Sequence, residues 1–333
     1  MNYKPILIVG GEPNSIFLEI YFKVLKSTKI NSPLILISSK KLLILQMKKL
    51  KFKKDIKILD PSKLDQYNLN NKFINLIDIK YDPINAFEKI TKKSNKFIEE
   101  SFETAFKIIK KKKIKKLING PVSKKNFLNK KFLGVTEYIS KKFLLKKTCM
   151  LIYNKTLSVC PVTTHLPLKL VSKSINRKNI SDKVFLINNF YKTKFGYNPK
   201  IAILGLNPHC ESIHKFNEDE KIIKPVIKNL KKKYNVSGPH SADTIFLKNN
   251  RINFNVIIGM YHDQVLTPLK TLYEYDAINI TLGLPFDRIS PDHGPNEKML
   301  GKNLSNPQSL QKAIKFLDKL WLKQKKVWVK IFW

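Results

Sequence analysis

The feature that most constrains this chain is a short apolar run ending in a histidine-bearing turn, which occurs three times. The runs are Leu157–His165 (L-S-V-C-P-V-T-T-H), Ile201–His209 (I-A-I-L-G-L-N-P-H) and Val256–His262 (V-I-I-G-M-Y-H). Each breaks at glycine or proline, which predicts a buried strand followed by a turn. Ligands of open α/β sheets bind beyond the carboxyl ends of the strands. The pattern therefore predicts three imidazoles near one edge of a sheet.

Three imidazoles that met there would form a metal site with an open position for substrate, so His165, His209 and His262 are the candidate metal ligands. A single histidine in such a turn is more often a hydrogen-bonded loop residue than a ligand. The pattern alone leaves the two interpretations about evenly balanced. The other histidines do not follow a strand so directly; they are His214, His240 and His293.

The net charge of +38 suggests a polyanion partner, but the composition of that charge argues otherwise. Among the 63 basic residues only Arg177, Arg251 and Arg288 are arginines, the residue type that reads bases and phosphates in a bidentate manner. A lysine-rich chain that is also rich in Ile, Asn, Phe and Tyr fits the bias of an A/T-rich genome. We therefore expect weak, salt-sensitive adhesion to polyanions and no specific nucleic-acid partner.

Strand and helix patterns alternate along the chain, which predicts an α/β fold with a largely parallel sheet. The residues between Lys57 and Tyr81 are irregular and suggest an edge hairpin. Cys149, Cys160 and Cys210 show no paired spacing, so neither a disulfide framework nor a thiolate zinc site is expected, and Cys160 reads as a core residue. Further predicted strands cover 5–9, 34–37, 116–118 and 278–282. Predicted helices cover 40–54, 85–113, 181–191, 221–233 and 309–323, with one passing through 21–26 and one entered at 132–138.

Polar residues follow the third histidine turn and suggest a small phosphorylated or carboxylated substrate. Lys270, Asn279 and Arg288 would supply two cations and an amide. Surface charge is the competing interpretation, strong for Lys270 and weak for Arg288 because arginine is scarce here. Asp243 and Asp263 are candidate proton acceptors, although capping of the following helix is the favoured role for Asp243.

Several familiar signatures are missing. The chain has neither the G-x-G-x-x-G turn nor the G-x-x-x-x-G-K-[ST] loop, so a bound nucleotide would be held by other loops. No secretory signal and no apolar run of about 20 residues is present, which predicts a cytoplasmic protein without a membrane partner. The aromatic C-terminal segment V-W-V-K-I-F-W is expected to pack against the body or a partner subunit.

Taken together, the motifs resemble the 4-hydroxythreonine-4-phosphate dehydrogenase family of vitamin B6 coenzyme synthesis. The resemblance spans nearly the whole chain in family order, and the set of motifs is highly specific although each one is short. The matching stretches are G-E-P, N-G-P-V-S-K, V-T-T-H-L-P-L, G-L-N-P-H, S-A-D-T-I-F, M-Y-H-D-Q and N-I-T-L-G-L-P-F-D-R.

The resemblance implies a two-lobed isocitrate-dehydrogenase-like fold with an interlobe cleft. The first lobe would comprise residues 1–125 and 275–333, and the second residues 126–274. It implies that His165, His209 and His262 bind one divalent ion (zinc, cobalt or magnesium), with Thr136, Lys270, Asn279 and Arg288 holding the substrate. It further implies NAD (or NADP) as oxidant and a homodimer that shares its active sites. The reaction would oxidise 4-phosphohydroxy-L-threonine and release carbon dioxide, leaving 3-amino-2-oxopropyl phosphate.

The chain departs from the family pattern at three places. The family's G-H-T-E is Gly134–Glu137, so that Val135 replaces a substrate-facing histidine. The turn G-E-P-A-G-I-G-P has become Gly11–Leu18, and the glycine-rich loop after G-L-N-P-H has become Cys210–Asn217. Added side chains in such loops would crowd a ligand. Two alternatives therefore stand beside the dehydrogenase, a relative acting on another hydroxy-acid phosphate and a non-enzymatic polyanion-binding protein.

Overall fold

A computed structural model describes residues 3–112, 114–129, 131–213, 216–291 and 293–329, with side chains given as far as 318 in the last helix. The chain forms two compact units, residues 1–135 with 285–333 and residues 136–284. The predicted boundaries, after residues 125 and 274, each lie ten residues before the observed boundaries, after residues 135 and 284. The second shift has a clear cause, because strand β11 (Ile278–Leu282) pairs antiparallel with β6 (Cys149–Tyr153) of the second unit.

The first unit is built on a parallel sheet in the order β3-β4-β2-β1-β5-β12. Its central strands are continuous apolar runs, as expected where helices cover both faces of a sheet. The edge hairpin predicted within Lys57–Tyr81 is wrong, because β3 and β4 run parallel and a loop of 15 residues (59–73) connects them. The strands are β1 (Ile6–Val9), β2 (Leu34–Ser38), β3 (Ile56–Ile58), β4 (Ile74–Asp78), β5 (Lys116–Asn119) and β12 (Asp287–Pro291).

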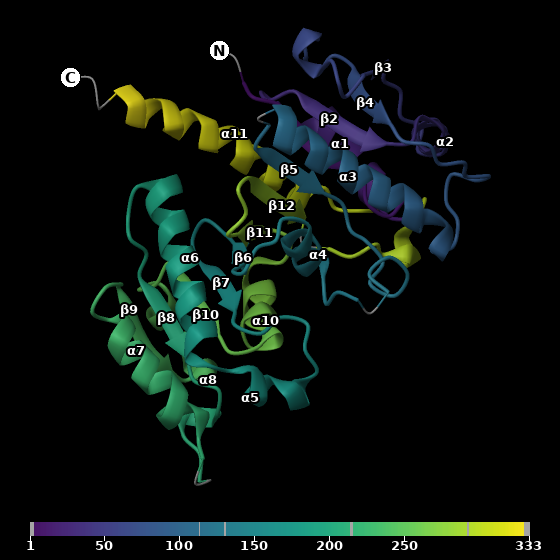
Figure 1. The fold of residues 1–333 in the computed structure, drawn as a ribbon. Helices are drawn as coiled ribbons and strands as arrows, with labels where there is room; N and C mark the ends of the chain where they lie inside the picture. The colour runs from purple at the N-terminus through teal and green to yellow at the C-terminus, as the bar shows by residue number, and fades with distance from the viewer. Residues whose placement is uncertain (1–2, 113, 130, 214–215, 292, 330–333) are drawn as a thin grey trace. The chain divides into compact units, whose positions relative to one another are not determined.

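Helices pack on this sheet through one apolar stripe each. Helix α3 contacts β1 and β2 (Figure 1). Its buried face is the predicted one and consists of Ile98, Phe102, Ala105, Phe106 and Ile109. It starts later than predicted because Thr91 caps a preceding 3-10 turn. The helix predicted to reach 54 ends at Lys49. The helices are α1 (Phe17–Ser27), α2 (Lys40–Lys49), α3 (Asn95–Lys112) and α11 (Gln308–Val329), with 3-10 turns η1 (Leu64–Gln66), η2 (Lys92–Ser94) and η6 (Glu297–Met299).

The second unit has the strand order β11-β6-β7-β10-β8-β9. Strand β6 is antiparallel to both of its neighbours, whereas β7, β10, β8 and β9 run parallel. The remaining bounds are β7 (Ser158–Pro161), β8 (Ile201–Leu204), β9 (Val236–His240) and β10 (Val256–Gly259). As predicted, Cys160 is a fully buried core residue.

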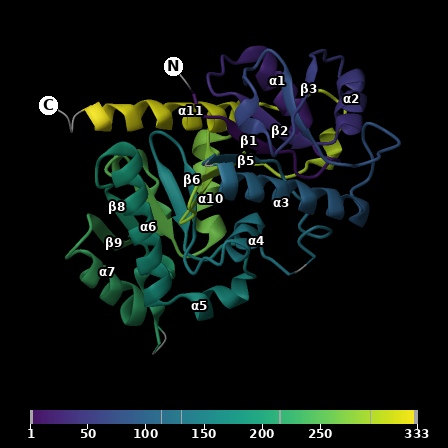
Figure 2. The same cartoon turned by 45° about the horizontal axis from the view of Figure 1, so that its top comes forward.

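Helices lie against this sheet as well (Figure 2). One core cluster joins alternate residues of β6, β7, β8 and β10 to Val265 and Leu269 of α10. Helix α6 contacts β6 and β11, and it runs from a cap at Asn176 to Gly196, whose φ of 80° ends it. The helices are α4 (Val135–Lys142), α5 (Val171–Ser174), α6 (Arg177–Phe195), α7 (Lys224–Leu230), α8 (Ala242–Ile245), α9 (Lys248–Arg251) and α10 (His262–Tyr273). Short turns are η3 (Leu168–Leu170), η4 (Pro208–Cys210) and η5 (Asp219–Ile223).

Two further predictions concern membrane-spanning helices and the aromatic C-terminal segment. Within the described residues, no helix has both the length and the apolar character that a membrane crossing requires. The end of the aromatic segment (330–333) and the side chains from 319 on, Trp321 included, lie outside the described part of the chain.

Candidate active site

Three neighbouring parallel strands deliver the three candidate histidines. Strand β10 lies between β7 and β8, so the carboxyl ends of all three strands meet at one edge of the second unit's sheet. His165 follows β7, His209 lies in the η4 turn after β8, and His262 is the first residue of α10 after β10. The strand ends are therefore confirmed as the places where these residues sit.

His165 and His262 come together. Their ring centroids are 5.5 Å apart, with the planes inclined at 41°. Two imidazoles bound to one tetrahedral zinc, each about 2 Å from the ion, hold their ring centres about 5 Å apart. The distance between the two ring centres therefore suits a shared cation.

A carboxylate orients one of these rings. Asp263 Oδ1 lies 2.6 Å from Nδ1 of His262. A histidine whose Nδ1 is held in this way presents Nε2 to a ligand, and such carboxylate partners are common behind metal-bound histidines. Asp263, predicted as a proton acceptor, is thus placed where it supports His262, while its side chain stays 79% exposed.

The turns that carry His165 and His262 are cross-linked. Thr163 donates both its backbone N–H (3.1 Å) and its hydroxyl (2.7 Å) to the carbonyl of Met260. Val162 donates to the carbonyl of Gly259 at 2.7 Å, which extends the β7–β10 ladder past the strands. These bonds fix the two turns relative to each other, and Thr163 is a contributor that the motif pattern did not single out.

The third turn has an unusual backbone. His209 and Cys210 have φ values of 53° and 62°, the left-handed region that non-glycine residues seldom adopt. Such a conformation costs on the order of 1–3 kcal/mol per residue and persists only where the surroundings impose it. Among the described residues no three His, Cys, Asp or Glu side chains are close enough to hold a metal ion. The convergence of all three histidines therefore stays a prediction.

His240 and His293 contact other groups in the structure. His240 Nε2 is 2.8 Å from the Ser237 hydroxyl, and burial lowers the pKa of this imidazole. His293 Nδ1 is 2.9 Å from the Gly294 carbonyl oxygen, and His214 lies outside the described residues. Asp243 is exposed in the first turn of α8. Its favoured role as a cap is wrong, since Ser241 is the N-cap residue and α8 has no side-chain cap bond.

Three of the predicted substrate residues belong to the second unit. The Thr136 hydroxyl, in α4, lies 3.3 Å from that of Thr281 on β11. Asn279 is on the same strand, and its buried Oδ1 lacks a hydrogen-bond partner within the described structure. Lys270 is half-buried on α10, the helix that His262 begins. A second link to the histidine turns is the hydroxyl of Thr164, which donates to Glu137 of α4 at 3.2 Å.

Arg288, the fourth predicted substrate residue, belongs to the first unit. It is 2% exposed, and its Nε donates to Oδ1 of Asn119 at 2.7 Å. Asn119 ends β5 and precedes the Gly120-Pro121 turn, so Arg288 is anchored to the N-G-P-V-S-K motif.

The Gly-Glu-Pro turn after β1 holds a buried acid. Gly11 has a φ of 76°, and a Cβ there would lie 2.4 Å from the Pro121 carbonyl oxygen, so only glycine fits. The Glu12 carboxylate accepts from the Asn14 N–H at 3.3 Å and the Ser94 hydroxyl at 3.1 Å. Its 1% exposure raises the pKa of Glu12 to about 7, because water is excluded from the carboxylate.

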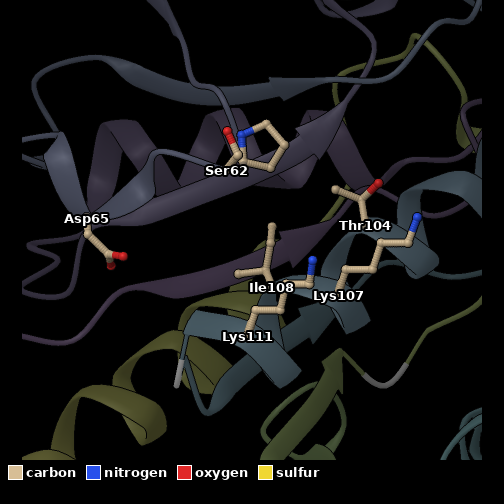
Figure 3. Close-up of a pocket in the computed structure, with 7 residues that line it drawn as sticks. Ser62, Asp65, Thr104, Lys107, Ile108 and Lys111 are labelled. Atoms are coloured by element: carbon tan, nitrogen blue, oxygen red, sulfur yellow. The ribbon is translucent and has the colours of Figure 1, made fainter.

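The first unit also has a cavity of about 780 Å³ beside α3 (Figure 3). Two lysines from successive turns of α3 face the loop after β3, but the cavity contains none of the predicted site residues. It is lined by Pro61, Ser62, Asp65, Thr104, Lys107, Ile108 and Lys111.

Comparison with known proteins covers most of the chain. The family "Pyridoxal phosphate biosynthetic protein PdxA" matches residues 29–317. A 4-hydroxythreonine-4-phosphate dehydrogenase from Sulfurihydrogenibium sp. is 38% identical over 316 residues, covering 93% of this chain and 96% of the relative. The Ruegeria sp. protein of the same name is 33% identical over 222 residues, 65% of this chain and 68% of its own. The crystal structure of that enzyme from Klebsiella pneumoniae superposes with a TM-score of 0.81 at 25% identity, covering 96% and 98% of the two chains.

Proposed function

The chain belongs to the family of the pyridoxal phosphate biosynthetic protein PdxA, and on this premise we propose that it is an NAD-dependent 4-hydroxythreonine-4-phosphate dehydrogenase. The observation that carries the proposal is the match to a relative of that name over 93% of the chain. In the proposed reaction, the secondary alcohol of 4-phosphohydroxy-L-threonine loses a hydride to NAD and a proton to a base. The β-keto acid so formed loses carbon dioxide, takes up a proton and leaves 3-amino-2-oxopropyl phosphate.

Two of the histidine turns bring their imidazoles to a spacing that suits a divalent cation. His165 and His262 have the ring spacing of a shared ion, Asp263 fixes the second ring, and we assign His209 as the third ligand. Three imidazoles suit zinc or cobalt better than magnesium. A bound ion would supply a Lewis acid for the hydroxyl oxygen of the substrate.

The other predicted residues would bind the rest of the substrate. Thr136, Lys270, Asn279 and Arg288 supply hydroxyl, ammonium, amide and guanidinium groups, which suit a phosphate and a carboxylate. Asp243 and Asp263 are the candidate proton acceptors. From the family membership we propose a cytoplasmic homodimer in which the active sites are shared between subunits.

The test is formation of NADH. Purified protein supplied with 4-phosphohydroxy-L-threonine, NAD and zinc, cobalt or magnesium should generate absorbance at the NADH band, and it should release carbon dioxide in equal amount. His262→Ala should abolish the signal, whereas His240→Ala should retain it, because His240 bonds to Ser237 instead of the paired rings. Absence of NADH with every cation would reject the proposal.

A second candidate follows from Val135, the first residue of α4, where the resemblance predicts a substrate-facing histidine. A valine there offers no hydrogen bond, so the chain could serve another hydroxy-acid phosphate. Val135→His should lower the KM for 4-phosphohydroxy-L-threonine about tenfold, the typical worth of one hydrogen bond to a charged group. A lowered KM in this variant, together with efficient oxidation of another hydroxy-acid phosphate by the wild type, would favour the second candidate, whereas an unchanged KM would argue against it.

A further inference from the structure

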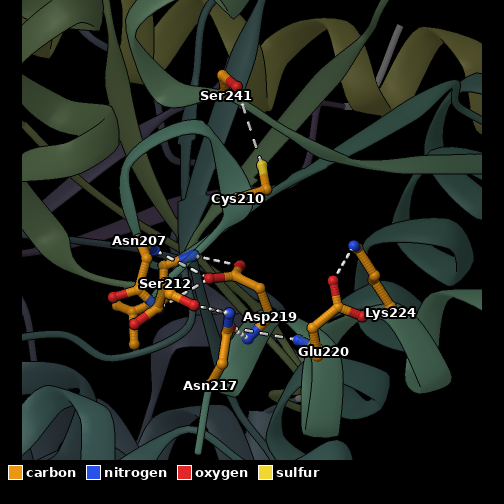
Figure 4. A network of polar contacts seen from close by, with 9 residues as sticks. Asn207, Cys210, Ser212, Asn217, Asp219, Glu220, Lys224 and Ser241 are labelled. Atoms are coloured by element: carbon orange, nitrogen blue, oxygen red, sulfur yellow. Dashed lines mark hydrogen bonds and ion pairs between the residues drawn. The ribbon is translucent and has the colours of Figure 1, made fainter. Parts of the chain in front are cut away.

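Two of the three cysteines lie against each other in the core of the second unit. Sγ of Cys149, the first residue of β6, is 3.2 Å from Sγ of Cys160 on β7. Both are free thiols, and their exposed fractions are 1% and 0%. Cys210 lies beside another partner, with its Sγ 4.0 Å from the Ser241 hydroxyl oxygen (Figure 4). The fold therefore creates a thiol pair that the spacing of the cysteines along the chain does not indicate.

The pairing of β6 with β7 explains why these two side chains meet. Ile152 pairs with Val159 in an antiparallel register. Continued by one residue, this register places Cys160 opposite Leu151, with Cys149 as its diagonal neighbour on the same face. Ile152 and Val159 belong to the core cluster with α10, so the cysteines occupy the other face of the sheet, where α6 contacts β6. The two sulfurs are only about 1 Å farther apart than in a disulfide.

A lysine of α6 supplies positive charge at this pair. Nζ of Lys183 donates to the carbonyl of Thr148, the residue before Cys149, at 2.7 Å. Burial raises the pKa of the Cys149 thiol, but the hydrogen bond with Cys160 and the charge of Lys183 outweigh it and hold this pKa below its ordinary value. Burial and the same hydrogen bond keep the pKa of Cys160 well above that value. Cys149 is therefore the thiol of the pair that ionises first.

We propose that Cys149 and Cys160 are a redox-sensitive pair that hydrogen peroxide converts into a reversible disulfide. The Cys149 thiolate attacks one peroxide oxygen and the O–O bond breaks, which leaves a sulfenic acid and hydroxide that takes up a proton. The sulfur of Cys160 then attacks the sulfenic sulfur, the S–O bond breaks, and a second water leaves with the Cys160 proton. The two thiols lose two electrons, and the peroxide is reduced to two molecules of water. This site does not depend on the proposed function.

Burial of the pair decides which oxidants it meets. Hydrogen peroxide is little larger than water and enters through small local openings of the fold, whereas a bulky disulfide reagent needs a larger opening. The disulfide would tether β6, the neighbour of the strand that carries Asn279, to β7, which leads into the turn of His165. Oxidation would therefore act on strands that lead to predicted site residues without modifying any of those residues.

The test is the thiol count of the folded wild type after treatment with a peroxide dose that oxidises the urea-unfolded chain. Counted under denaturing conditions, the thiols should fall from three to one. Mass spectrometry should find the peptides of Cys149 and Cys160 joined with the loss of two hydrogens, and dithiothreitol should restore all three thiols. Three surviving thiols would overturn the proposal, as would a disulfide that includes Cys210.

Variants separate the roles of the two thiols. Cys160→Ala should stop at the sulfenic acid of Cys149, which dimedone labels, whereas Cys149→Ala should give neither label nor disulfide. Should a cysteine variant not fold, the wild-type thiol count decides alone.

The charge on α6 sets the rate of the reaction. Lys183→Met should slow disulfide formation at pH 7 about three- to tenfold, because a rise of one pKa unit cuts the thiolate fraction tenfold and is partly offset by greater nucleophilicity. Lys178→Met, at an exposed lysine of the same helix that pairs with Asp182, should keep the wild-type rate. Equal rates for the two lysine variants would contradict Cys149 as the attacking thiolate.

Discussion

Two strand ends, one in each unit, bury a carboxylate without a cation, and they do so with different consequences. Asp219, behind the β8 turn, accepts three N–H groups and is fully buried. Glu12, after β1, accepts one long backbone bond and one hydroxyl, and its pKa rises to about 7. No ion pair to either acid occurs within the described residues. The comparison teaches that a buried acid can anchor a turn through several aligned donors, as Asp219 does, whereas burial with few donors raises the pKa of Glu12 to about 7.

The two turns also differ in which residues adopt positive φ angles. The β1 turn uses Gly11, whereas the β8 turn uses His209 and Cys210 and is braced by Asp219. Gly11→Ala should therefore be the most damaging change, lowering the free energy of unfolding by about 4 kcal/mol through φ strain and backbone overlap. Urea unfolding would measure it.

Two other glycines separate the cost of φ strain from the cost of backbone overlap. Gly196 also has a positive φ but open space around its Cβ position, so Gly196→Ala should cost only about 1 kcal/mol. Gly294 has neither constraint, and Gly294→Ala should be neutral. Equal effects at all three positions would contradict this account of the β1 turn.

Glu12 should make stability depend on pH. Its folded pKa of about 7 lies above the ordinary value of 4.5, so folding favours the protonated acid. Stability is therefore complete below pH 4.5 and falls as the pH rises to 7, by about 3 kcal/mol. Glu12→Gln should remove this loss, being about 3 kcal/mol more stable than wild type at pH 8 and nearly equal at pH 4.5. A difference independent of pH would refute the raised pKa.

Replacing Asp219 by its amide should lower the free energy of unfolding at neutral pH, whereas the same change at Glu12 should raise it. Asp219→Asn leaves buried N–H donors of Leu206 and Asn207 facing an amide, which should cost about 2 kcal/mol. Urea unfolding of the metal-free protein at pH 7 measures it beside Glu12→Gln. If the Asn variant were as stable as wild type, the three bonds would not be the anchor described here.

The smallest effect is expected at the exposed partner of His262. Asp263→Asn keeps an oxygen that can accept from Nδ1 but removes the charge, so Co²⁺ affinity should fall about tenfold. Asp82→Asn, at the surface pair of the first unit with Lys41, is the matched control. Equal affinities for the two variants would show that Asp263 does not support the ring.

The sequence predicted the parts of this site that depend on local pattern. Buried apolar runs ending in glycine or proline located β7, β8 and β10 with their histidines, because the run and its breaker are adjacent in the chain. The parallel order of these strands allowed His165 and His262 to be expected together. The left-handed φ values of His209 and Cys210 could not be predicted from the sequence, since only glycine adopts this conformation routinely.

Contacts between distant segments escaped prediction. Gln264 and Asp219 are ordinary polar residues in helical patterns, and only the folded sheet brings them to Gly205 and Asn207. The parallel pairing of β3 with β4 was missed because an edge strand of three residues carries too little periodicity. Glu12 was seen as part of a motif, but its burial depends on Ser94 and the Pro121 turn, which the sequence does not place beside it.

Co²⁺ titration of the alanine variants of His165, His209 and His262 shows whether these three histidines hold one cation. We expect one tightly bound Co²⁺ per wild-type chain, with binding lost in each of the three variants and retained in His240→Ala. Stoichiometric, tight binding that survives all three substitutions would contradict it, as would a wild type that binds no ion.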